Sequence, residues 1–225
     1  MRHQQPAVDY RAFQLSKLNT PEFRHLKLLL YWPVFGFFFL FVERLTPVTH
    51  YFPIYCTLDD LIPFCEFFVI PYLFWFVYLV GMLLYTLRYD IDAFQKMMNF
   101  TIISYSITTL IYLIFPTCQE LRPTEFTRDN LFTRFLFYFY HFDTSTNVCP
   151  SIHVIGSVSV WCTSWTIERF QTPAWKAAFS VAAVLICVST VFLKQHSVVD
   201  VLAAIPICLI AYYFSFRWRN EYARR

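Results

Sequence analysis

The chain has 225 residues, of which 57% are hydrophobic, 21% aromatic and only 15% charged, and its formal net charge is +3. Soluble domains contain fewer apolar and more charged residues, and here the apolar residues come in long runs, so we expect one integral membrane domain. The basic residues are scattered between these runs and form no continuous stripe, which excludes nucleic acid as a partner.

A polar N-terminal arm is predicted over residues 1–27, which carry several basic residues and are interrupted by Pro6 and Pro21. The first apolar run begins too far from Met1 for a removable signal peptide, and no small-residue cleavage site follows it. We therefore expect this run to stay as the first membrane span.

Six apolar runs predict an all-α fold, a polytopic integral membrane bundle of six helices over residues 28–216. The expected spans are residues 28–42, 63–87, 98–115, 151–167, 177–193 and 198–216. A polar connection over 116–150 precedes the fourth span, and its aromatic middle, 131–140, is expected in the membrane interface. Residues 217–225 form a basic tail.

The distribution of basic residues predicts how the spans are oriented. If the N-terminus is cytoplasmic, 13 of the 18 Lys and Arg residues fall on the inner side, and the outer side receives Arg44, Arg122, Arg128, Arg134 and Lys194. Cytoplasmic connections carry the excess of positive charge, so both termini are expected in the cytoplasm. The 116–150 connection and the 194–197 turn then lie together on the outer face, and we expect the plasma membrane as the location.

The seven cysteines show no CxxC spacing, and an odd number cannot all pair within one chain. Metal binding through them is therefore not expected. Cys56, Cys118 and Cys149 fall in polar connections, so a disulfide among these three stays open at this point.

The stretch from Asn147 to His153 places a proline, a hydroxyl and an imidazole where a polar loop becomes an apolar helix. Pro150 suits the first helical position, and the N–H groups of the next residues would then lack intrahelical partners, an arrangement that favours phosphate. Ser151 adds a hydroxyl donor and His153 a titratable proton. The alternative is a membrane helix begun by proline with an incidental histidine.

A second pattern follows the fifth span. His196 and Asp200 are four residues apart at the start of a helix, so their side chains lie on one face within reach of each other. The carboxylate can hold one ring N–H and leave the other nitrogen as a nucleophile. The alternative is structural, with Asp200 as a helix cap and His196 in the headgroup layer.

Taken together, three short motifs resemble those of the type 2 phosphatidic acid phosphatase (PAP2) superfamily in order and separation. They are Arg122-Pro123, Pro150-Ser151-Ile152-His153, and Ser189 followed by His196 and Asp200. The likeness covers the chain from the third span to the sixth and implies the six-helix membrane architecture of that family.

The resemblance also implies a role for each matching residue. His196 would be the nucleophile that forms a phosphohistidine, Asp200 would orient it, and His153 would protonate the leaving alcohol. The phosphoryl oxygens would be held by Arg122, Ser151 and the backbone N–H groups around Ile152. Ser189, within the motif, and Lys194, which lies on the same outer turn as His196, are further candidates for phosphate binding. Neither a metal nor another cofactor is implied, and the partners would be a lipid phosphate or phospholipid and the membrane.

The chain departs from the common family pattern at three positions. The usual Lys seven residues before Arg122 is Phe115, the usual Gly of the central motif is Ile152, and the usual Arg after Ser189 is Thr190. Two cationic phosphate ligands are therefore missing. Residues that could restore positive charge are Lys194, Arg128 and Arg134. The substitutions at 152 and 190 are closer to the branch that resembles inositol phosphorylceramide and sphingomyelin synthases, which transfers a phospho-headgroup to an alcohol.

The leading hypothesis is hydrolysis of a lipid phosphate, since the proposed phosphohistidine would sit on a short outer turn accessible to water. Transfer to an alcohol is the second hypothesis, and it would need an acceptor site for which residues 131–140 and Glu66 are the candidates. A non-catalytic lipid-binding protein is the third. A transporter is disfavoured because the polar residues gather at one face and no inverted repeat is visible.

Overall fold

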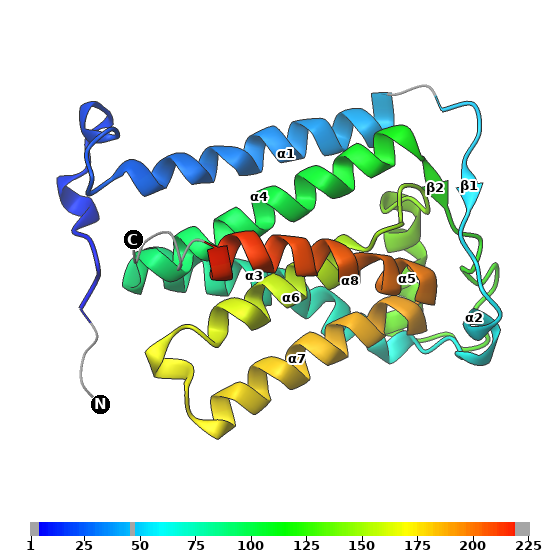
Figure 1. Cartoon of the computed structure of the whole chain (residues 1–225). Coiled ribbons are helices and arrows are strands. Elements are labelled where there is room, and N and C mark those ends of the chain that lie inside the picture. Colours follow the sequence, from blue (N-terminus) through cyan, green and yellow to red (C-terminus); the bar gives the residue numbers. More distant parts are fainter. Residues whose placement is uncertain (1–4, 46–47, 219–225) are drawn as a thin grey trace.

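The computed structural model describes residues 5–45 and 48–218, and it consists almost entirely of helices (Figure 1). Within these residues, five helical segments are long and apolar enough to cross a membrane: Arg24–Leu45, Glu66–Tyr89, Ile91–Ile114, Pro173–Phe192 and Val198–Trp218. The protein is therefore an all-α integral membrane protein, as the composition predicts.

Each long segment is built around one α-helix. The first contains α1 (Tyr31–Leu40), which follows a 3-10 helix (Arg24–Leu30) and continues into a π-helical turn (Phe41–Leu45). The others contain α3 (Val69–Tyr89) after a 3-10 turn at Glu66–Phe68, α4 (Ile91–Ile114), α7 (Pro173–Phe192), and α8 (Val198–Tyr212) with its π-helical end, Tyr213–Trp218.

The predicted fourth span is shorter in the structure than the sequence predicted. Its helix, α6 (Ile152–Ser164), has 13 residues, which correspond to about 20 Å, whereas the hydrocarbon core of a bilayer is about 30 Å thick. The prediction of six spanning helices is thus not confirmed at this element. Because α6 packs against α3, α4, α7 and α8, most of its surface contacts protein and needs no lipid-facing length.

Close packing around α6 depends on Gly156. A Cβ atom at this position would lie 2.8 Å from Nε1 of Trp75 and 2.9 Å from the hydroxyl of Tyr105. The absence of a side chain therefore lets α3 and α4 approach α6 closely, as small residues do in membrane bundles.

The connections from α1 to α3, from α4 to α6 and from α7 to α8 lie at one end of the bundle (Figure 1). They contain α2 (Leu58–Leu61), α5 (Leu131–Phe142) and two short parallel strands, β1 (Phe52–Pro53) and β2 (Thr117–Cys118), in which Phe52 pairs with Thr117. The aromatic stretch expected in the interface is α5, whose N-terminus is capped by the side chain of Asn130. All seven cysteines are free thiols, so no disulfide ties these connections together.

The segment before α1 and the end of the last helix lie at the opposite end (Figure 1). The predicted polar arm packs there: the hydroxyl of Tyr10 donates to the carbonyl of Leu87 at 2.7 Å, and Phe23 is fully buried. Of the predicted basic tail, residues 217–218 continue the last helix and 219–225 lie outside the described residues.

The Gly156→Ala variant should lower the free energy of unfolding by about 1–3 kcal/mol, because the added methyl group overpacks the contact with Trp75 and Tyr105. Thermal unfolding in detergent measures the change. Gly81→Ala is the matched control, since a Cβ there meets nothing within 4 Å. Equal behaviour of the two variants would contradict the close approach.

Candidate active site

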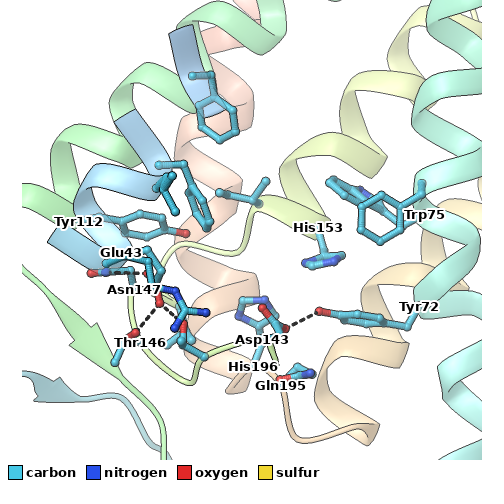
Figure 2. A pocket seen from close by; sticks show the side chains of 18 residues that line it. Glu43, Tyr72, Trp75, Tyr112, Asp143, Thr146, Asn147, His153, Gln195 and His196 are labelled. Atoms are coloured by element: carbon cyan, nitrogen blue, oxygen red, sulfur yellow. Dashed lines mark hydrogen bonds between the residues drawn. The ribbon is translucent and has the colours of Figure 1, made fainter. Parts of the chain in front are cut away.

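A cavity of about 360 Å³ lies where the connections meet the helix ends. Its walls come from α1 and the turn after it, from α3 and α4, from the start of α6, and from the connections that precede α6 and α8. The lining residues are Phe35, Phe39, Leu40, Glu43, Arg44, Tyr72, Trp75, Phe76, Tyr112, Asp143, Thr144, Thr146, Asn147, Val148, Ile152, His153, Gln195 and His196 (Figure 2).

His196 and Asp200 make the contact that their spacing predicts. The ring nitrogen Nδ1 of His196 lies 3.0 Å from Oδ2 of Asp200, and since a carboxylate only accepts, Nδ1 carries the hydrogen. The same oxygen accepts the backbone N–H of Ser197 at 3.0 Å, so Asp200 both caps α8 and orients the imidazole. The sequence left open whether Asp200 caps the helix or holds the ring of His196, and in the structure it does both.

His153 stands in the first turn of α6 beside two aromatic rings of α3. The ring centroids of Tyr72 and Trp75 lie 4.4 and 4.5 Å from that of His153, and they fix the plane of its imidazole. The centroid of His196 lies 5.9 Å away across the cavity (Figure 2). Nε2 of His153 is buried and has no hydrogen-bond partner among the described residues. Two imidazoles thus face one small space.

Other buried polar side-chain atoms near the two histidines also have no hydrogen-bond partner among the described residues. Oε1 of Gln195 accepts from Arg122, and because a guanidinium only donates, the amide nitrogen of Gln195 must point the other way. That nitrogen and the hydroxyl of Ser151 have no partner in the described part of the chain. Buried donors without partners are rare in folded proteins, and the amide nitrogen of Gln195, which lines the cavity together with both histidines, suits an anionic ligand. Ser151 does not line the cavity, and two buried acceptors, Oδ1 of Asn147 and Oδ1 of Asp200, also have no partner among the described residues.

Arg122 does not line the cavity in the described structure. Its guanidinium donates to the carbonyls of Tyr140, Asp143 and Thr144 at 3.0, 2.7 and 2.9 Å, and to Gln195. It therefore holds the connection before α6 and positions two lining residues, Asp143 and Gln195. Direct phosphate binding, as the resemblance implies for Arg122, would require it to leave these partners.

Two more of the predicted phosphate ligands lie elsewhere. Nζ of Lys194 donates to the carbonyl of Asp59 at 2.6 Å, and the hydroxyl of Ser189 donates to the carbonyl of Ile186 at 2.6 Å within α7. The suggested replacement cations, Arg128 and Arg134, pair with Glu66 at 3.3 Å and with Asp129 at 2.7 Å, respectively.

The start of α6 also differs from the sequence prediction. The helix begins at Ile152, so Pro150 precedes it and Ser151 is its N-cap. The backbone N–H of Ser151 is not free, because it donates to the carbonyl of Asp200 at 3.2 Å. This bond joins α6 to α8 and brings the two predicted motifs together, while Ile152 lines the cavity as a bulky apolar residue.

The lining residues that were not predicted as site residues include Glu43, Arg44, Asp143 and Gln195. Glu43 accepts hydrogen bonds from Thr144, Thr146 and Asn147, which fastens the end of the first span to the connection before α6. Burial raises the pKa of the Asp143 carboxyl, an effect that Arg122 and His196 partly offset. For Glu43 and Arg44, the sequence contains one indication of a site: a charged pair directly follows the first apolar run.

Asp59 supports the turn that carries His196. Its buried carboxylate accepts the Ser197 hydroxyl at 2.6 Å and the Val198 N–H at 2.8 Å, so it neutralises the N-terminal end of α8. Burial raises the pKa of the Asp59 carboxyl, but the hydrogen bonds from Ser197, Val198 and Cys56 together outweigh this, and the net shift is downward. Sequence reasoning missed this residue, because the contact joins positions far apart in the chain.

Comparison with known proteins gives one match. The sequence model of a family described as the PAP2 superfamily matches residues 96–224, more than half of the chain. The matched part contains Arg122, His153, His196 and Asp200, whereas α1 and α3 lie outside it. No curated protein and no solved structure matches the chain.

The Asp59→Asn variant should lose about 1–3 kcal/mol of unfolding free energy at neutral pH, because a buried charged acceptor at the start of α8 is replaced. A carboxyl with a depressed pKa stabilises the fold above its unfolded-state pKa, and this contribution disappears as the pH falls through the folded-state value. The difference from the unaltered protein should therefore shrink in acid. Asp60→Asn is the control, since Asp60 is exposed; an equal loss in that variant would count against the role of Asp59.

Proposed function

The chain belongs to the PAP2 superfamily, and from this premise we propose that it cleaves the phosphate ester of a membrane lipid through a phosphohistidine intermediate. The observation that carries the proposal is the facing pair of imidazoles, one of them held by a buried carboxylate, in a single cavity. Family membership supports a phosphoesterase-type activity, and the following steps are derived from the residues of this cavity.

In the first step, Nε2 of His196 attacks phosphorus and the ester P–O bond breaks. Asp200 keeps the hydrogen on Nδ1, so the lone pair stays on Nε2, and it stabilises the positive charge that develops on the ring. The departing alkoxide takes a proton from His153, which stands across the cavity at 5.9 Å between ring centroids. The products are a lipid alcohol and a phosphorylated His196.

In the second step, water attacks the phosphorus and the P–N bond breaks. His153, now neutral, accepts the proton that the water loses, and inorganic phosphate leaves with His196 restored. One imidazole must therefore be neutral and the other protonated at the start, so activity should peak between two macroscopic pKa values.

Arg44 is our candidate for one of the missing phosphate cations. It lines the same cavity as both histidines, and a planar guanidinium can donate two hydrogen bonds to a phosphate. The amide nitrogen of Gln195 and the hydroxyl of Ser151 would supply neutral donors. Arg122 would act through Gln195, which it orients.

Water is the acceptor we propose, with transfer to an alcohol, as in inositol phosphorylceramide or sphingomyelin synthases, as the second candidate. The residues suggested for an acceptor site support water: Glu66 is engaged with Asn130 at 3.0 Å, and none of the described residues 131–140 lines the cavity. Incubation with headgroup-labelled phospholipid and ceramide or diacylglycerol distinguishes hydrolysis from transfer, since transfer would move the label into a new lipid.

A non-catalytic lipid-binding role is disfavoured, because the buried Asp200 remains paired with His196.

The first prediction from this mechanism concerns the leaving group. His153→Ala should slow the cleavage of an alkyl phosphate by about 10²–10⁴-fold and that of a nitrophenyl phosphate far less, because nitrophenolate departs without a proton. Steady-state rates with the two substrates measure this. His141→Ala, outside the cavity lining, is the control, and equal losses for both substrates in His153→Ala would contradict its role as the acid.

A second prediction tests Arg44. Arg44→Gln should lower kcat/KM for a lipid phosphate by about 10–100-fold, the loss expected when a hydrogen-bonded charge near the phosphate is removed. Arg134→Gln is the matched control, since Arg134 is exposed and pairs with Asp129. If both variants keep full activity, another group supplies the positive charge.

We further propose that α6 is the fourth of six spans and that the active site faces outward from the plasma membrane, with both termini cytoplasmic. The excess of basic residues on one side of the spans supports this orientation. In a cysteine-free background, Glu125→Cys should react with an impermeant reagent on intact cells. Gln171→Cys, in the connection between α6 and α7, should react only after permeabilisation. The reverse pattern would refute the orientation.

A further inference from the structure

The cavity changes from apolar to charged along the wall that α1 provides. Phe35, Phe39 and Glu43 recur every fourth residue and so form one row, and Leu40 and Arg44 form the next. The row from Phe35 to Glu43 covers roughly 12 Å of helix axis. A ligand that follows this wall meets charge at one end and only aromatic and aliphatic side chains at the other.

The opposite wall, on α3, also becomes more apolar with distance from the connections. Tyr72, Trp75 and Phe76 lie on one face of the helix, and the first two contact the ring of His153 (Figure 2). Phe76 lies further along α3, away from the connections. The apolar surface therefore begins at the proposed general acid and leads from it into the membrane-spanning part of the bundle.

Two residues that line the apolar part of the cavity are also exposed on the outside of the helix bundle. Leu40 on α1 is 55% exposed and Phe76 on α3 is 51% exposed, although both line the cavity. Because both belong to segments long and apolar enough to span the membrane, their exposed sides face lipid hydrocarbon. A substrate diffusing in the bilayer can therefore reach the histidines sideways, without leaving the membrane.

We propose that the hydrocarbon chain of the lipid substrate lies between α1 and α3, in the channel formed by Phe35, Phe39, Leu40, Trp75 and Phe76, and that the lipid enters through the opening between Leu40 and Phe76. The proposal rests on the proposed function and specifies its substrate as a chain-bearing phosphate ester drawn from the bilayer. Continuity of the channel with the space between His153 and His196 selects this occupant over a second protein chain.

The experiment uses the full-length protein in phosphatidylcholine vesicles and compares long-chain phosphatidic acid with a short-chain, water-soluble analogue. In Leu40→Trp, the ratio of kcat/KM for the long-chain to the short-chain substrate should fall about tenfold, the size of effect that a misfit of one or two methylene groups causes in an apolar site. Val34→Trp is the matched control on α1, because Val34 is 50% exposed but does not line the cavity. An unchanged ratio in Leu40→Trp, or an equal fall in Val34→Trp, would overturn the channel.

A binding measurement separates failure of the channel from failure of the proposed function. Phosphatidic acid with a photoreactive group in its acyl chain is activated in vesicles that contain the unaltered protein, and the labelled residues are identified by mass spectrometry. Label concentrated on residues 35–40 and 75–76 supports the channel even if no substrate is turned over. Label spread evenly over all lipid-facing helices would contradict it, even if the protein is an active phosphatase.

Discussion

The site depends on how the chain accommodates the buried carboxylate of Asp200. A carboxylate removed from water is costly unless it accepts hydrogen bonds, and here Oδ2 accepts from the imidazole of His196 and from the N–H of Ser197. Oδ1 is buried and has no hydrogen-bond partner among the described residues. These donors sit on the tight turn between α7 and α8, so the turn must be rigid. Asp59 fastens it from the side of α2, and the hydroxyl of Tyr140 fastens it from α5 by donating to Leu193. Contacts from two separate connections therefore hold the turn that carries the His196 imidazole.

Sequence reasoning succeeded where the determining contacts are local. The long apolar runs predicted the five helices that are long enough to span a membrane, and the spacing of four residues predicted the contact between His196 and Asp200. His196 lies in the turn just before α8, so the contact arises where Asp200 caps that helix. Sequence reasoning did not find Glu43 or Asp59, whose contacts join distant segments, nor Arg44 as a lining residue of the cavity. For the same reason it assigned Arg122 to the phosphate, whereas the fold surrounds that guanidinium with carbonyls. The length of α6 was also overestimated, because apolar residues extend beyond the point where the helix ends.

The cavity has a charged end and an apolar end, as a lipid phosphate has a charged headgroup and an apolar chain. Its charged end contains two histidines, the Arg44 guanidinium and unpartnered donors, and it also contains the carboxyls of Glu43 and Asp143. Glu43 is neutralised in part by three donors, and Asp143 lies 4.0 Å from Arg122, so neither faces the cavity as an isolated charge. The aromatic end lies between α1 and α3, outside the part of the chain that matches the family. Both histidines and Asp200 thus lie in the matched part, whereas the proposed channel for the hydrocarbon chain lies outside it.

The central claim is that His196 carries the phosphoryl group, and trapping that intermediate tests it most directly. The protein is mixed with a lipid phosphate labelled in its phosphorus, denatured rapidly in alkali, in which phosphohistidine survives, and digested for mass spectrometry. The account predicts label on His196 that disappears during a chase with unlabelled substrate and is recovered as inorganic phosphate, with no label on protein in His196→Ala. Turnover of the substrate with label on another residue, or with no labelled protein under any quenching condition, would contradict the account.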